Sequence, residues 1–184
     1  MDLLIAAGHT FERLVAAIPV TAWENGTPCG ISVREVVDHV VAGNVFSALL
    51  LSGVPRAEAR AALSGDHIGD DPVGAVVVSC ARQHAAFSAA DPASLVPHPG
   101  GDLSLRKFLR YRVGDLAVHA WDVAQGAGLD DTLPPHLVDG LWEMVAPHVD
   151  EMRTMGTFGD GASQNLPADT PLQVRLLDAF GRRP

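Results

Sequence analysis

The sequence predicts an all-α protein, and three observations support this fold class. Apolar residues recur at steps of three and four along several long stretches, which is typical of amphipathic helices. Segments rich in proline and glycine separate these stretches, and helix-capping residues stand at their starts. No regular alternation of strands with helices, internal repeat or low-complexity tract is evident. With 184 residues and 47% hydrophobic side chains, the chain can bury a core, and we expect a single domain over 1–184.

The first two helices are predicted from the spacing of apolar residues and from the turn-forming and capping residues at their ends. Residues 2–18 carry the first amphipathic pattern, and a turn-forming composition over 21–30 should follow it. Ser32 and Glu35 then form a capping box, in which each side chain can bond the backbone N–H of the other. The second helix therefore starts at Ser32, and the run 52–55, Ser-Gly-Val-Pro, should end it.

The remaining helices are predicted in the same way. Asp71 and Pro72 together mark the start of a helix. The Asp71 side chain can cap it, and proline suits the first helical position, where a backbone N–H would lack a partner in any case. Ser104 is the cap of the clearest helix in the chain. The segments 91–102 and 153–169 have no helical period and are predicted as connections. The expected helices cover 72–90, 105–125, 134–152 and 171–180.

Charge and cysteine content exclude several classes of function. A formal net charge of −9, with Lys and Arg scarce and dispersed, argues against binding to nucleic acid. No apolar run reaches the roughly 18 residues that a membrane span needs, and no basic leader precedes the first apolar stretch, so a cytoplasmic protein is expected. With only Cys29 and Cys80, reduced thiols are expected, Cys80 buried in a helix and Cys29 in a loop.

The helix over 105–125 carries an unusual polar stripe. One line of residues at helical spacing is apolar and should face the core. The neighbouring line has ionisable residues in its middle, and charged groups beside an apolar face must be paired or bound to an ion. The second line consists of Leu105, Phe108, Arg112, Asp115, His119, Asp122 and Gly126.

Asp115 and His119 lie four residues apart, so that one ion can bind both side chains on the same helix face. A carboxylate and an imidazole suit zinc, and also nickel or iron(II). Asp122, one turn further, can orient the imidazole of His119. The spacing by itself is more typical of an ion pair on a helix surface than of a metal site, and Arg112 can pair with Asp115 or bind an anionic substrate.

A third ligand would have to come from another helix, and His39 is the best candidate. It lies in the middle of a helix with apolar neighbours, and Gly43 one turn later leaves room beside it. The alternative is a hydrogen-bonded histidine in the core. His84 also stays open as a ligand, because the helix over 72–90 can face the same site.

At this point the chain resembles a known family. Trp23, the Thr27-Pro28-Cys29 turn and the segments 32–40 and 118–124 are similar to the actinobacterial metal-binding proteins related to mycothiol-dependent maleylpyruvate isomerase, in the DinB-like superfamily. The stretches 168–171 and 176–184 are similar to the end of a small single-domain subfamily. The resemblance implies a four-helix bundle in up-down-down-up order, here with extra short C-terminal helices, and a metal site at one end.

The resemblance also implies which residues hold the metal. His39 and His119 match the histidine ligands of the family. The third ligand is glutamate in the isomerase and histidine in many relatives, whereas this chain has the shorter Asp115. The isomerase has a further C-terminal domain at its active site that has no counterpart in these 184 residues, which argues against maleylpyruvate isomerisation itself.

Two functions follow from this pattern. In the first, a divalent metal held by His39, Asp115 and His119 binds the sulfur of a small thiol such as mycothiol, for thiol transfer or thiol-assisted isomerisation, with Arg112 and Asp122 near the thiol or substrate. In the second, a degenerate site binds a metal or small ligand without catalysis. A homodimer formed through bundle faces is compatible with both.

Overall fold

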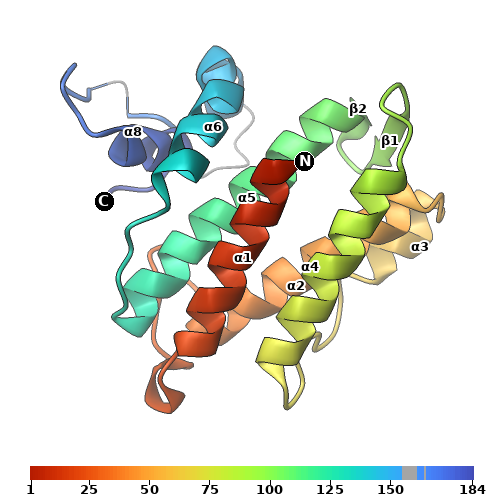
Figure 1. Cartoon of the computed structure of the whole chain (residues 1–184), viewed down its shortest axis with the longest axis horizontal. Helices are drawn as coiled ribbons and strands as arrows, with labels where there is room; N and C mark the ends of the chain where they lie inside the picture. Colours follow the sequence, from red (N-terminus) through yellow and green to blue (C-terminus); the bar gives the residue numbers. More distant parts are fainter. Residues whose placement is uncertain (155–160, 164) are drawn as a thin grey trace. The chain divides into compact units, whose positions relative to one another are not determined.

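The computed structural model describes residues 1–154, 161–163 and 165–184, and it consists mainly of helices (Figure 1). The chain divides into two compact units, Met1–Asp131 and Thr132–Pro184, and each is described by itself. The prediction of one domain over 1–184 stays a prediction. The elements of the first unit are α1 (Asp2–Ala17), a 3₁₀ turn (Val20–Ala22), α2 (Val33–Leu51), α3 (Arg56–Ala61), α4 (Pro72–Ala89), β1 (Leu95–His98), β2 (Gly101–Ser104) and α5 (Leu105–Ala127).

Four long helices of the first unit form a bundle. Helix α1 packs on α4 and α5, and α2 packs on the same two helices. Figure 1 shows α1 and α5 running in one direction and α2 and α4 in the other, which is the expected up-down-down-up order. The core contains fully buried apolar side chains from all four helices, among them Leu4, Phe11, Val36, Val40, Val76, Val113 and Leu116. The all-α fold class is confirmed.

The predicted helix starts are confirmed in detail. The N–H of Ser32 donates to Glu35 Oε2 at 2.7 Å, and the N–H of Glu35 donates to Ser32 Oγ at 3.3 Å, which completes the capping box of α2. Asp71 accepts from the N–H of Gly74 at 2.9 Å at the start of α4. Ser104 accepts from the N–H of Lys107 at the start of α5. These contacts satisfy backbone donors that a helix leaves without partners in its first turn.

Two elements of the first unit differ from the prediction. The short helix α3 lies in a stretch for which no element is predicted from the sequence. The segment 91–102, predicted as a connection, contains most of an antiparallel hairpin in which Leu95 pairs with Ser104 and His98 with Gly101. Each strand has four residues, too few to show a clear alternation, although Val96 is buried on the bundle. The turn composition was recognised, but not the pairing beside it.

The second unit contains α6 (Pro135–Val145), a 3₁₀ turn (Ala146–His148), α7 (Val149–Thr154) and α8 (Leu172–Ala179). The single helix predicted over 134–152 is wrong, because the chain breaks it at the turn that contains Pro147, which has no N–H to donate within a helix. The terminal helix predicted over 171–180 is confirmed as α8. The connection predicted over 153–169 lies partly outside the described residues.

Candidate metal centre

The polar stripe of α5 lies at the edge of the bundle core. Arg112 is 8% exposed and Asp122 is fully buried, whereas the side chains of Asp115 and His119 are 22% and 14% exposed. The adjacent apolar line, including Val113, is buried as predicted. Charged groups at such depth need partners, and each of these residues has one.

Three of the predicted site residues converge. The Nε2 atom of His39 lies 3.4 Å from Asp115 Oδ1, and His119 Nε2 lies 3.6 Å from the same oxygen. One ligand atom from each of the three side chains can be chosen so that the three atoms lie within 4.8 Å of one another. The two imidazole rings are 5.0 Å apart and meet nearly at right angles. Helices α2 and α5 therefore bring together two nitrogens and one oxygen at a single point.

Asp115 uses its two oxygens differently. Its Oδ2 atom accepts a hydrogen bond of 3.0 Å from Arg112 Nη1, while Oδ1 faces the two histidines. Burial acts to raise the pKa of Asp115, but the charge of Arg112 and the contact with His39 hold this pKa well below its usual range. The ion pair and the metal site, which are alternatives in the sequence, are thus compatible in the structure.

A buried hydrogen-bond network fixes Arg112. Its Nε atom donates to Gln83 Oε1 at 2.7 Å and its Nη2 atom donates to Asn44 Oδ1 at 2.8 Å. Gly43 on α2 makes room for the guanidinium, since a Cβ there would lie 2.6 Å from Arg112 Nη1. The space beside Gly43 is therefore filled by Arg112. Each of the three guanidinium nitrogens donates a hydrogen bond to another side chain, so Arg112 positions Asp115. A role of Arg112 in binding a thiol or substrate stays a prediction.

Protein groups also hold His119. Its Nδ1 atom lies 2.9 Å from Asp122 Oδ2, as expected for a carboxylate that orients the ring. Burial acts to lower the pKa of His119, but hydrogen bonds to Asp122 and Cys29 and the charge of Asp115 raise it to about 9. For Cys29, burial acts to raise the pKa of the thiol, but hydrogen bonds to His119 and Thr27 lower it below its usual value.

Cys29 is the residue of the site that sequence reasoning missed. Its loop lies on the end of α5, where Asn25 Nδ2 donates to the carbonyl of Gly126 at 3.0 Å. A Cβ at Gly126 would lie 2.8 Å from Thr27 Cγ2, so glycine at this position allows the close contact. Gly126, the last residue of the polar stripe, was the available signal, but the spacing on α5 does not show which loop packs there.

The histidines considered as ligands from other helices differ in their surroundings, and so does His67. His39 is an exposed residue, with 55% of its side chain accessible, so the core alternative for it is wrong. His84 Nε2 lies 3.1 Å from the carbonyl of Leu4, which gives that ring a structural partner outside the converging set. His67 is largely buried, and its Nδ1 atom lies 3.2 Å from Asp38 Oδ2.

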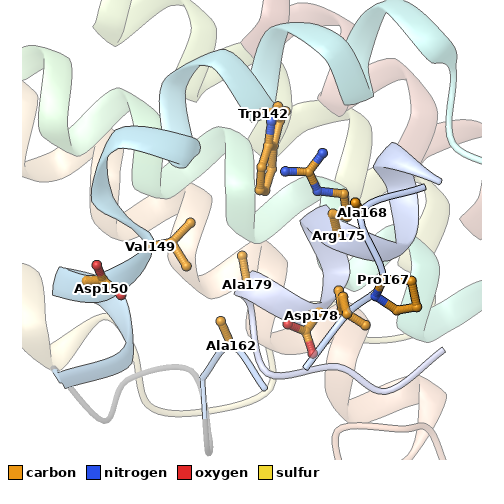
Figure 2. A pocket seen from close by; sticks show the side chains of 10 residues that line it. Trp142, Val149, Asp150, Ala162, Pro167, Ala168, Arg175, Asp178 and Ala179 are labelled. Carbon is orange, nitrogen blue, oxygen red and sulfur yellow. The ribbon is translucent and has the colours of Figure 1, made fainter. Parts of the chain in front are cut away.

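The second unit has a cavity of about 350 Å³. Figure 2 shows the indole of Trp142 and the guanidinium of Arg175 beside one another at its edge, and the guanidinium lies 4.9 Å from the ring centre. Asp178, which lines the cavity, forms an ion pair with Arg183, with 3.0 Å between Oδ1 and Nη1. Every lining residue belongs to this unit, and none of the candidate metal ligands is among them.

Comparisons with known proteins agree with the first unit. The family model described as the mycothiol maleylpyruvate isomerase N-terminal domain matches residues 4–124, which contain α1 to most of α5 and all three converging side chains. The chain belongs to this family. It is also 28% identical over 142 residues to the uncharacterized proteins MT0763 and Rv0738 of two Mycobacterium tuberculosis strains, CDC 1551 / Oshkosh and H37Rv, covering 74% of each chain. No solved structure matches.

Membrane insertion of a helix finds no support in the described residues. None of the helices there is both long and apolar enough to cross a bilayer.

Proposed function

We propose that this chain binds one divalent metal ion through His39, Asp115 and His119 and uses it to bind the sulfur of a small thiol such as mycothiol, for thiol transfer or thiol-assisted isomerisation. Zinc suits this ligand set best, and nickel or iron(II) also suit it. The proposal places the protein in the cytoplasm, where its two free cysteines stay reduced.

The observation that carries the proposal is the spacing of the three donor atoms. Separations of 3.4 and 3.6 Å between the histidine nitrogens and Asp115 Oδ1 are longer than the 2.7–3.2 Å of good hydrogen bonds. Two ligands about 2.1 Å from one zinc ion at a tetrahedral angle are about 3.4 Å apart. The separations match those expected between ligands of one ion, which supports the proposal. Asp115, although shorter than glutamate, reaches both imidazoles.

The surroundings favour an open site. More than half of the His39 side chain is exposed, so that a small molecule can approach from this side. Three protein ligands leave a fourth tetrahedral position for it. When bound, the metal would lower the pKa of the thiol and so favour the thiolate.

The residues around the ligands would fix the orientation of the Asp115 and His119 side chains. Arg112 holds Asp115 Oδ2 at 3.0 Å and leaves Oδ1 free to bind the ion. Asp122 accepts from the Nδ1–H of His119, which would fix the tautomer that presents Nε2 to the metal.

A non-catalytic binding protein is the second candidate. It is favoured by the ion pair between Arg112 and Asp115, because a guanidinium so close withdraws charge from the carboxylate and weakens it as a ligand. Metal without thiol binding is the expected result for this candidate. A homodimer is compatible with both candidates and can be measured by analytical ultracentrifugation.

The metal site is tested by metal analysis of protein purified without chelator. We expect about one ion per chain in the unaltered protein and in His9→Ala, a control that removes an exposed histidine of α1. His39→Ala and His119→Ala should lose the ion. Unchanged metal content in both variants would rule out the proposed ligands.

The thiol-binding step is tested separately with the cobalt-substituted protein. Mycothiol should change the visible absorption of the cobalt ion and add a sulfur-to-cobalt charge-transfer band. Loading with cobalt but no spectral change on adding mycothiol would contradict thiol binding and support the non-catalytic candidate.

A further inference from the structure

His119 belongs to a second group of potential ligands besides the one with His39. Donor atoms of Cys29, His119 and Asp122 also lie within 4.8 Å of one another. Asp115 Oδ1 faces the Nε2 side of the His119 ring at 3.6 Å, whereas Asp122 Oδ2 faces its Nδ1 side at 2.9 Å. One imidazole therefore stands between two sets of donors.

The protein holds Cys29 near this histidine. Thr27 Oγ1 lies 3.1 Å from Cys29 Sγ and donates to the carbonyl of Ile31 at 2.7 Å, so the thiol lies in a closed turn. Gly26 pairs with Ser32 across the same turn. Cys29 is half-buried, whereas Asp122 is fully buried, so an ion can enter from the side of the thiol. The loop thus presents a sulfur atom to the end of α5.

We infer that Cys29, His119 and Asp122 form a second, sulfur-containing ligand set that takes a soft divalent cation such as cadmium. Thiolate sulfur prefers soft cations, and a set with one sulfur, one nitrogen and one oxygen suits a four-coordinate ion. On binding, the Sγ–H bond of Cys29 breaks and His119 gives up the Nδ1 proton that faces Asp122. The sulfur and the nitrogen then bond to the metal, and both protons pass to solvent; no atom is oxidised or reduced. This inference goes beyond the proposed function, because it needs neither His39 nor Asp115. Since both sets use His119, it describes an ion bound in place of the first one, and the metal-free chain is the form in which it is tested.

The test is titration of the metal-free full chain with cadmium chloride, followed by the ultraviolet sulfur-to-cadmium charge-transfer band. The unaltered protein should show the band. Cys29→Ser should lose the band completely and bind cadmium at this set at least about tenfold more weakly. Cys80→Ala is the matched control and should keep the band, because Cys80 is fully buried in α4. His39→Ala should also keep it, since His39 is absent from this set.

Three outcomes would overturn the inference. They are no band in the unaltered protein, a band that survives in Cys29→Ser, and a band that disappears in His39→Ala, which would make Cys29 a ligand of the His39 ion instead. The His39→Ala arm also separates this inference from the proposed function: loss of metal at the first set with the band intact leaves the second set standing.

A measurement on the unaltered protein tests the inference even if a variant fails to fold. In the native protein, only the half-buried Cys29 should react readily with a thiol reagent such as dithionitrobenzoate. Cadmium should slow this reaction at least about tenfold, whereas magnesium, which prefers oxygen ligands, should not. Equal labelling rates with and without cadmium would contradict a cadmium–sulfur bond at Cys29.

Discussion

The two helices that form the candidate metal centre support their ligands very differently. On α5, Asp115 is bound by the buried Arg112 and His119 by the fully buried Asp122. On α2, the side chain of His39 is 55% exposed, and its Nε2 atom contacts Asp115 Oδ1 at 3.4 Å. The comparison teaches that the fold supports the two residues on α5 with buried partners, whereas it leaves the residue on α2 largely exposed to solvent.

The largest effect is expected from removing the support of α5. Arg112→Met should destabilise the protein by about 3–5 kcal/mol, because it leaves Asp115 without its buried cation and two amide oxygens without a donor. Urea unfolding of the metal-free protein measures this. Arg112→Lys should recover part of the loss through its charge. A loss under about 1 kcal/mol would mean that α5 does not depend on this network.

A smaller loss is expected for His119→Ala. The change removes a hydrogen-bond partner of the buried Asp122, which should cost about 2–3 kcal/mol in the free energy of unfolding. His119→Asn is the control, because an amide can still donate to Asp122. Equal stability of the alanine variant and the unaltered protein would show that Asp122 does not need the imidazole.

The pH dependence of stability should follow the same ring. His119 has a folded pKa of about 9, above its ordinary 6.5, so the stabilisation it provides is complete below pH 6.5 and is lost as the pH rises through about 9. Urea unfolding of the metal-free protein across this window should show the decrease, and His119→Ala should not. A bound metal requires the neutral ring, so metal affinity should rise with pH in the same window. Metal affinity that does not change with pH would argue against His119 as a ligand.

The smallest effect on stability is expected for His39→Ala. Since the ring is largely exposed and its polar contact with Asp115 is long, the free energy of unfolding should change by no more than about 0.5 kcal/mol. Metal content should nevertheless fall as in His119→Ala. Thermal unfolding with chelator and metal analysis without it give the two numbers. If His39→Ala destabilised the protein as much as His119→Ala, the contrast between the two helices would be wrong.

Local sequence signals predicted most of the first unit. The capping box of Ser32 and Glu35 and the Asp71-Pro72 start gave helix starts that the structure confirms, because caps act within four residues of the chain. Errors arose where elements are short or interrupted, as in α3, the hairpin over 95–104 and the break at Pro147. Four-residue strands and single helical turns contain too few positions to show a period.

For the site, the sequence by itself determined that Asp115, His119 and Asp122 share one face of a helix, because the spacing of side chains on α5 is a property of the backbone. The sequence also made His39, on another helix, the best candidate for a third ligand, and the family resemblance supported this choice. Only the tertiary structure decided that Asp115 divides its oxygens between Arg112 and the histidines. It also decided that His39 is exposed and that Cys29 lies beside His119. These contacts join residues far apart in the chain, and the packing of α2 and the Cys29 loop on α5, which brings them together, depends on the whole bundle.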